Sequence, residues 1–151
     1  MRQLTLIRPA LRPMSAEEVD TVIAGLGISL PKDVRDFLIA HQGTRPIEND
    51  HPEQCICLFM PLKMPGDHEE ITIPEEMRNL HEALELSTFD WLPIAADPGG
   101  NLTCIKLNDP GAGGVYFLDH HSFGDEDFAR FVSPSITAYL DALVSGDHYE
   151  L

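Results

Sequence analysis

Residues Trp91 to His121 decide the fold of this chain, and they read W-L-P-I-A-A-D-P-G-G-N-L-T-C-I-K-L-N-D-P-G-A-G-G-V-Y-F-L-D-H-H. Three short apolar runs, 91–95, 102–107 and 115–119, are separated by turns rich in glycine, proline and aspartate. Such runs indicate β-strands. Their short connections favour antiparallel pairing, because parallel strands need long crossovers. This stretch therefore predicts a three-stranded antiparallel meander.

Four helices are predicted around the meander, each from apolar residues that recur every three or four positions. The first begins at a capping box, Ser15-Ala16-Glu17-Glu18, and the second lies between Pro31 and Gly43. The third begins at Thr72-Ile73-Pro74, and Ser133-Pro134 opens the last. His41 falls in the last turn of the second helix, where the partial negative charge of the helix end favours a cation.

A fourth strand is expected before the third helix, because residues 55–62 form a continuous apolar run. The polar segments on either side, 44–54 and 64–70, are expected to be loops. At 151 residues the chain is long enough to bury one core without staples. Since the strands cluster rather than alternate with helices, the expected class is α+β: a single domain with a mainly antiparallel sheet flanked by about four helices.

Acidic residues dominate the charge of the chain, with 25 Asp and Glu against 10 Lys and Arg and a net charge of −15. Binding to nucleic acid or to an anionic membrane relies on Lys and Arg, so neither is an expected partner. An acidic field attracts a basic protein and speeds encounter with it. The charge therefore favours a protein partner.

The cysteines and the N-terminus both indicate a cytoplasmic protein. Cys55, Cys57 and Cys104 are an odd number, all within apolar runs, which is typical of buried thiols in a reducing compartment. The apolar residues 4–7 are too few for a signal peptide. No apolar run approaches the ~20 residues that span a bilayer.

A metal site is the strongest enzymatic alternative, since Asp119-His120-His121 supplies potential ligands in a row. If this segment is a strand, His120 and His121 point to opposite faces; if the strand ends at Asp119, both fall in a turn. The chain shows no paired-ligand zinc spacing and no G-x-S-x-G nucleophile motif. The Gly99-Gly100 turn leads into a strand rather than a helix, which argues against phosphate binding. A hairpin turn is the better explanation of these glycines, and Asn101 tolerates a left-handed conformation there. We expect no catalytic residue, no metal and no cofactor, and keep a metal-dependent enzyme using His120 and His121 as an alternative.

Three motifs carry a resemblance to a known family. They are Leu30 to Leu38 leading to Gly43, then Leu92 to Leu107 with its Asp97 and Gly99-Gly100-Asn101 turn, and Gly114 to His121 followed by the helix from Ser133 to Leu143. In this order the chain resembles the SUKH superfamily, which groups yeast-type cell-wall-assembly regulators with bacterial proteins of toxin-immunity loci. The resemblance implies one SUKH-like domain over residues 1–151, with a core at about 15–145. Residues 44–74 match none of the family's motifs.

The resemblance also implies a function. It indicates a binding role without enzymatic activity, and in bacterial members that role is to bind and block a cognate toxin, often a nuclease. We therefore expect an immunity protein that neutralises a basic toxin, and keep a regulatory or scaffold protein with no toxin partner as an alternative. The first candidates for the partner-binding patch are Asp125, Glu126 and Asp127, followed by Glu69 and Glu70. Strand edges and apolar loop residues such as Phe123 leave a homodimer open.

Overall fold

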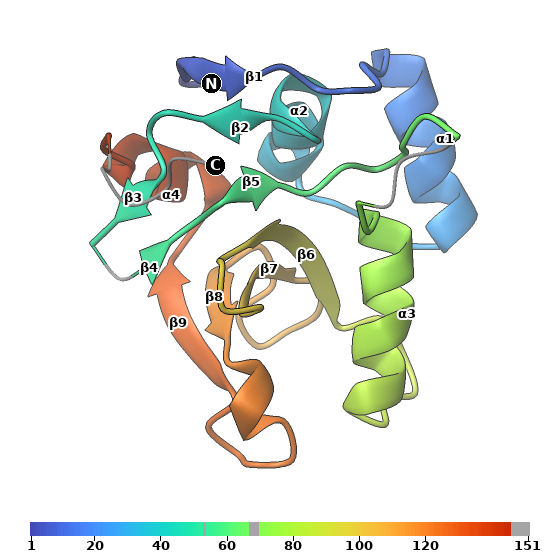
Figure 1. The fold of residues 1–151 in the computed structure, drawn as a ribbon. Helices are drawn as coiled ribbons and strands as arrows, with labels where there is room; N and C mark the ends of the chain where they lie inside the picture. The colour runs from blue at the N-terminus through green and yellow to red at the C-terminus, as the bar shows by residue number, and fades with distance from the viewer. Residues whose placement is uncertain (53, 67–69, 146–151) are drawn as a thin grey trace.

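A five-stranded antiparallel sheet forms the centre of the computed structural model, which describes residues 1–52, 54–66 and 70–145 (Figure 1). Its strand order is β5-β6-β7-β8-β9. The bounds are Leu58–Phe59, Trp91–Ala96, Leu102–Lys106, Val115–Leu118 and Ala129–Ser133. All four neighbouring pairs are antiparallel. The predicted meander and the α+β class are confirmed.

Two small sheets lie where the sequence predicts a loop. β1 (Leu6–Arg8) pairs with β2 (Arg45–Pro46), and β3 (Asp50–His51) pairs with β4 (Gln54–Cys55). The prediction of a loop over 44–54 is therefore wrong in part. The strand β1 was also not predicted, because three residues carry too little periodicity to be recognised.

The apolar run 55–62 is not one strand, although its residues are mostly buried. Only Leu58–Phe59 forms β5. The backbone N–H groups of Cys57 and Met60 bond to β6, at 2.7 and 2.8 Å, whereas that of Phe59 bonds to the Thr44 carbonyl at 2.9 Å. The segment thus divides its hydrogen bonds between two neighbours, which an apolar run alone does not reveal.

The four predicted helices are present: α1 (Ala16–Leu26), α2 (Lys32–His41), α3 (Ile73–Ala83) and α4 (Ile136–Ala142). Ser15 caps α1 in the predicted capping box, and Gly27 ends it in the left-handed conformation at φ 68°. α4 begins two residues later than predicted, since Ser135 is its N-cap and Ser133 belongs to β9. None of the described helices has the length and apolarity needed to cross a bilayer.

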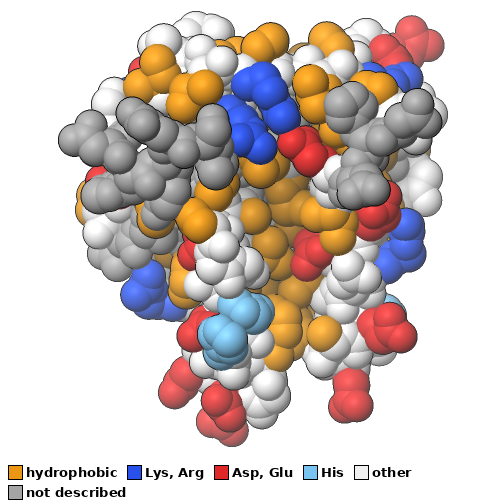
Figure 2. All heavy atoms as spheres, viewed as in Figure 1, with side chains coloured by type: hydrophobic (Ala, Val, Ile, Leu, Met, Phe, Trp, Pro, Cys, Tyr) orange, Lys and Arg blue, Asp and Glu red, His pale blue; other side chains and the backbone are white. Residues whose placement is uncertain are grey.

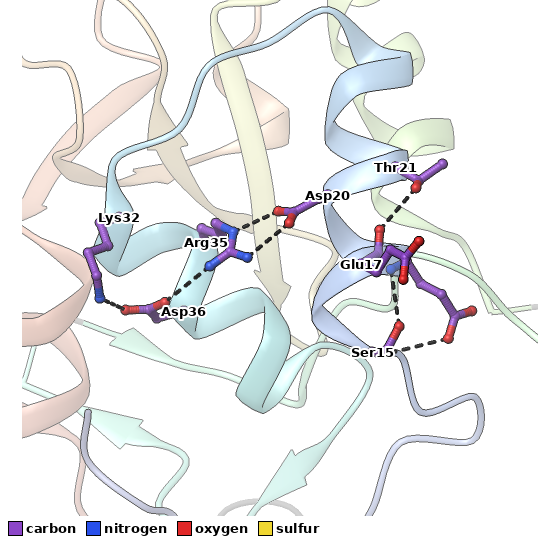
Figure 3. Close-up of polar contacts among 8 residues, drawn as sticks. Ser15, Glu17, Asp20, Thr21, Lys32, Arg35 and Asp36 are labelled. Atoms are coloured by element: carbon purple, nitrogen blue, oxygen red, sulfur yellow. Dashed lines mark hydrogen bonds and ion pairs between the residues drawn. The ribbon is translucent and has the colours of Figure 1, made fainter.

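One ion pair joins α1 to α2, and a second lies within α2 (Figure 3). Arg35 of α2 donates to both carboxylate oxygens of Asp20 of α1, at 2.6 and 2.9 Å, whereas Lys32 and Asp36, 2.7 Å apart, are both in α2. The hydrogen bonds from Arg35 lower the pKa of Asp20. Because these side chains are exposed or half-exposed, the two pairs add little to the stability of the fold.

The core is continuous, and the helices pack against it from several sides. α3 packs on β6, α2 packs on α4, and α4 packs on β9 (Figure 1). Trp91 is 7% exposed and belongs to the core. Cys104 is buried, whereas Cys55 and Cys57 are half-buried, so the expectation of three buried thiols is wrong for two. Both lie near the short hairpin of β3 and β4, which leaves them at the margin of the core.

Candidate functional site

The acidic loop predicted from the sequence forms an exposed tip between β8 and β9. A short 3₁₀ helix, η1 (His120–Ser122), follows β8, and Asp119 caps it by accepting from the His121 N–H at 3.0 Å. The Asp125 N–H then bonds to the Ser122 carbonyl at 2.9 Å. Asp125, Glu126 and Asp127 are all exposed at this tip.

Another acidic residue, Glu85, follows the end of α3 and has an unusual backbone conformation. Glu85 has φ 53° and is the only non-glycine residue with a positive φ in the described part of the chain. Its N–H bonds to the Glu82 carbonyl at 3.2 Å, and the next N–H, of Leu86, bonds back to the His81 carbonyl at 3.0 Å. This is a Schellman motif, in which glycine is the usual residue at the left-handed position.

The end of α3 and the η1–β9 loop face each other across a groove. The two segments project at the same end of the molecule, and acidic side chains gather on both tips with apolar surface between them (Figures 1 and 2). The groove encloses about 250 Å³. Its lining residues are Ala83, Leu84, Glu85 and Leu86 on one side and Gly124, Asp125, Glu126 and Phe128 on the other.

The apolar part of this groove is backed by the core. The Phe128 ring lies edge-on to Trp91 at 6.0 Å and to Phe123 at 6.1 Å between centroids. Phe123, one of the apolar loop residues that left a homodimer open, is half-buried and packed against Phe128. Because Trp91 is itself nearly buried, Phe128 joins the groove floor to the core.

The three carboxylates of the groove are exposed to solvent. Within residues 1–52, 54–66 and 70–145, none of the ion pairs includes Glu85, Asp125 or Glu126. No described Lys or Arg forms a salt bridge that offsets their charges. The groove is therefore a site of negative potential with an apolar floor.

Glu70, one of the second pair of predicted acidic residues, lies away from this groove. Arg8 donates to both carboxylate oxygens of Glu70, at 2.8 and 3.2 Å, and Arg45 lies 3.6 Å from Glu70. The hydrogen bond from Arg8 holds the pKa of Glu70 below its usual value. Glu69 falls outside the described residues. The structure thus brings Asp125 and Glu126 together with Glu85, and pairs Glu70 with arginines near β1 and β2.

The histidine pair occupies one turn rather than two faces of a strand. β8 ends at Leu118, and the rings of His120 and His121 lie 3.9 Å apart between centroids. His120 Nδ1 lies 2.7 Å from Oδ1 of Asn101, whose side chain also donates to Asp97. In the part of the chain that the structure describes, no group of three or more His, Cys, Asp or Glu residues is placed to hold a metal ion.

The Gly99-Gly100 turn differs from the prediction in one detail. The left-handed residue is Gly100, with φ 87°, and not Asn101. Asn101 instead uses its side chain, since its amide and its backbone N–H both donate to the Asp97 carboxylate. Asn101 thus links the β6–β7 turn to His120 by a side-chain hydrogen bond. The two glycines belong to the turn of a hairpin, since β6 and β7 pair antiparallel.

Sequence reasoning missed Glu85, the groove residue contributed by α3. The periodicity of α3 ends at Leu84, and no glycine follows where a helix end commonly has one. Many helices end without a left-handed residue, as α4 does at Leu143, so the missing glycine does not mark Glu85. The sequence also does not show what Glu85 faces, because its neighbours across the groove come from residues 124–128.

The structure is a small α+β domain with an acidic groove at one end. Residues 13–142 match the SMI1/KNR4 family (SUKH-1), and the chain belongs to that family. The match covers all four helices and the whole five-stranded sheet. Domains of this family serve generally as non-enzymatic binding modules of toxin-immunity or cell-wall-regulator type. A search of curated proteins gave no significant match.

Proposed function

We propose that the chain is an immunity-type protein that binds a basic cognate toxin, of the nuclease kind, and neutralises it in the cytoplasm without a bond-making step of its own. The observation that carries this proposal is the exposed acidic tip of Asp125, Glu126 and Asp127, which form no ion pair with any described residue. Family membership supports a protein partner. A nuclease binds phosphates with Lys and Arg, so an acidic tip is complementary to its cleft.

Charge also bears on the rate of binding. The net charge of −15 steers a basic partner toward the protein over distances comparable to the Debye length, which is about 8 Å at physiological salt. A toxin must be captured before it acts, and steered association meets that need. Glu69 and Glu70 are proposed as secondary contacts, because the arginines beside Glu70 already offset its charge.

The test is neutralisation of the product of a neighbouring toxin gene. Cells that express this toxin should survive when the chain is present, and the purified pair should bind with an affinity that falls as salt rises. The variant Asp125→Asn/Glu126→Gln/Asp127→Asn should bind at least tenfold more weakly. A control with the same change of charge on remote exposed sites, Glu17→Gln/Glu75→Gln/Asp141→Asn, should bind within about twofold of the unmodified chain.

The family match also favours a second candidate, a regulatory module of the cell-wall-regulator type. Such a module binds a cellular protein and protects against no toxin. If the neighbouring gene product is harmless, or if the chain neither binds it nor rescues cells from it, the immunity proposal is wrong and this candidate takes its place.

A further inference from the structure

The groove between α3 and the η1–β9 loop has a size that suits side chains rather than a small ligand. It encloses about 250 Å³, below the roughly 300–1,000 Å³ typical of small-molecule sites. Its floor is made by Leu84, Leu86 and Phe128, all half-buried. An apolar floor of this size accommodates one or two side chains of a protein partner.

The charges on the groove walls specify which residues of the partner can flank the side chains that enter the groove. Glu85 lies on one wall, and Asp125 and Glu126 lie on the other. All three are exposed, and no described cation pairs with them. A segment that enters the groove therefore meets carboxylates on both sides of an apolar floor. Only a segment that places Lys or Arg on either side of an apolar residue satisfies both features.

The backbone of Glu85 adds an independent observation. A glutamate in the left-handed conformation costs about 1 kcal/mol relative to the glycine that usually occupies this position. Strained residues of this kind cluster at binding sites, where the side chain serves a role that the fold alone does not require. Here the side chain that replaces glycine is a carboxylate on the wall of the groove.

We infer that this groove is the docking site for a basic segment of the partner, in which an apolar side chain enters the groove and flanking Lys or Arg residues pair with Glu85, Asp125 and Glu126. The inference rests on the proposed binding function and specifies the chemistry of the partner at that site. It adds α3 to the acidic tip as a second wall. It also assigns the apolar floor the role of an anchor, which salt does not screen.

Two peptides of equal charge test the inference. One alternates arginine with leucine, and the other alternates arginine with serine. In ¹⁵N-resolved NMR titrations, the arginine–leucine peptide should shift the amide signals of Leu84, Leu86 and Phe128 and bind about tenfold more tightly than the arginine–serine peptide. Equal binding of the two peptides, or shifts confined to other surfaces, would overturn the inference.

Variants of the chain locate the site. Glu85→Gln/Asp125→Asn/Glu126→Gln should weaken binding of the arginine–leucine peptide at least tenfold. The remote control Glu17→Gln/Glu75→Gln/Asp141→Asn should change it less than twofold. Ala83→Arg, at an exposed helical position on the groove wall, should also abolish binding by filling the groove. Equal losses of affinity in both triple variants would show that the peptide responds only to the net charge of the chain. That result is incompatible with the inference.

Toxin neutralisation separates this inference from the proposed function. If the unmodified chain neutralises the toxin and the groove variants do so equally well, the groove is not the docking site although the proposed function stands. If the groove binds the peptide as described and no toxin is neutralised, the groove stands and the proposed function fails.

Discussion

Glu85 places a carboxylate on the groove wall at a cost in the stability of the fold. Its φ of 53° is a conformation in which a Cβ atom is costly, and it closes the Schellman motif of α3. Glu85→Gly should therefore stabilise the fold by about 1 kcal/mol, seen as a higher midpoint of urea unfolding. The same change should weaken binding of a basic partner, since it removes a carboxylate from the groove.

The matched control for this prediction is Glu85→Ala, which removes the charge but keeps the Cβ atom. It should show no gain of stability. A Glu85→Gly variant that unfolds at lower urea than the unmodified chain would contradict the prediction, because the conformation would then not be strained.

His41 is buried, and burial disfavours the charged ring that the sequence predicts at the end of α2. The sequence predicts a cation at the end of α2, but the side chain is 3% exposed and lies between the rings of Phe37 and Phe59, at 5.6 and 5.8 Å. Burial lowers the pKa of His41, although Nε2 lies 3.3 Å from the Arg2 carbonyl. The folded state therefore favours the neutral ring.

A pH dependence follows from this shift. The unfolded chain binds a proton at His41 near pH 6.5 and the folded chain only at lower pH, so the stability that the neutral ring contributes is present above about pH 6.5 and is lost as pH falls through the folded pKa. An NMR titration of the ring should give a pKa below 6.5. Urea unfolding from pH 7.5 to 5 should show a smaller loss in His41→Phe, which cannot ionise. An equal loss in both proteins would assign the effect to other groups.

At the scale of elements, the helix starts follow local chemistry. Ser15 Oγ accepts from the Glu18 N–H at 3.1 Å, and the Glu18 carboxylate accepts from the Ser15 N–H at 3.3 Å. Ser15→Ala should cost about 1 kcal/mol in urea unfolding, because one backbone donor at the start of α1 loses its partner.

Ser15→Gly is the control for this cap, since glycine at an N-cap costs only about a few tenths of a kcal/mol. The order of stability should be serine, then glycine, then alanine. An alanine variant as stable as the glycine variant would mean that the capping box does not stabilise α1.

Three strands, β9, β1 and β2, show where element prediction fails. β9 reads A-R-F-V-S, and its residues pair with β8 along the whole of that strand. In the sequence it lies between an acidic loop and a Ser-Pro pair that indicates a helix start, so its few residues carry no clear period. β1 and β2 pair although about 40 residues separate them. Pairing of this kind depends on the packed core rather than on local pattern.

At the scale of the whole molecule, the acidic charge acts on folding and on binding in opposite ways. A net charge of −15 destabilises the folded state by self-repulsion. Raising sodium chloride from about 10 to 150 mM shortens the Debye length from about 30 to 8 Å. The midpoint of urea unfolding should therefore rise, while affinity for a basic partner should fall.

Urea is required for this measurement because guanidinium would itself supply ions. The variant Asp125→Asn/Glu126→Gln/Asp127→Asn should show a weaker dependence of the unfolding midpoint on salt, since three of its acidic charges are gone. A midpoint that falls with added salt would indicate that attractive ion pairs outweigh the repulsion.

Local sequence was sufficient to predict the α+β class, the meander of residues 91–119, the four helices and the acidic loop at Asp125 to Asp127. These features depend on the spacing of apolar residues and on caps and turns that span a few residues, so they are encoded locally. The tertiary structure alone decided that Glu70 pairs with Arg8 and that Arg2 donates to the last carbonyls of α4, at Leu140 and Leu143. It also placed Glu85 opposite Asp125 and Glu126, because contacts between distant segments are set by how the helices pack on the sheet.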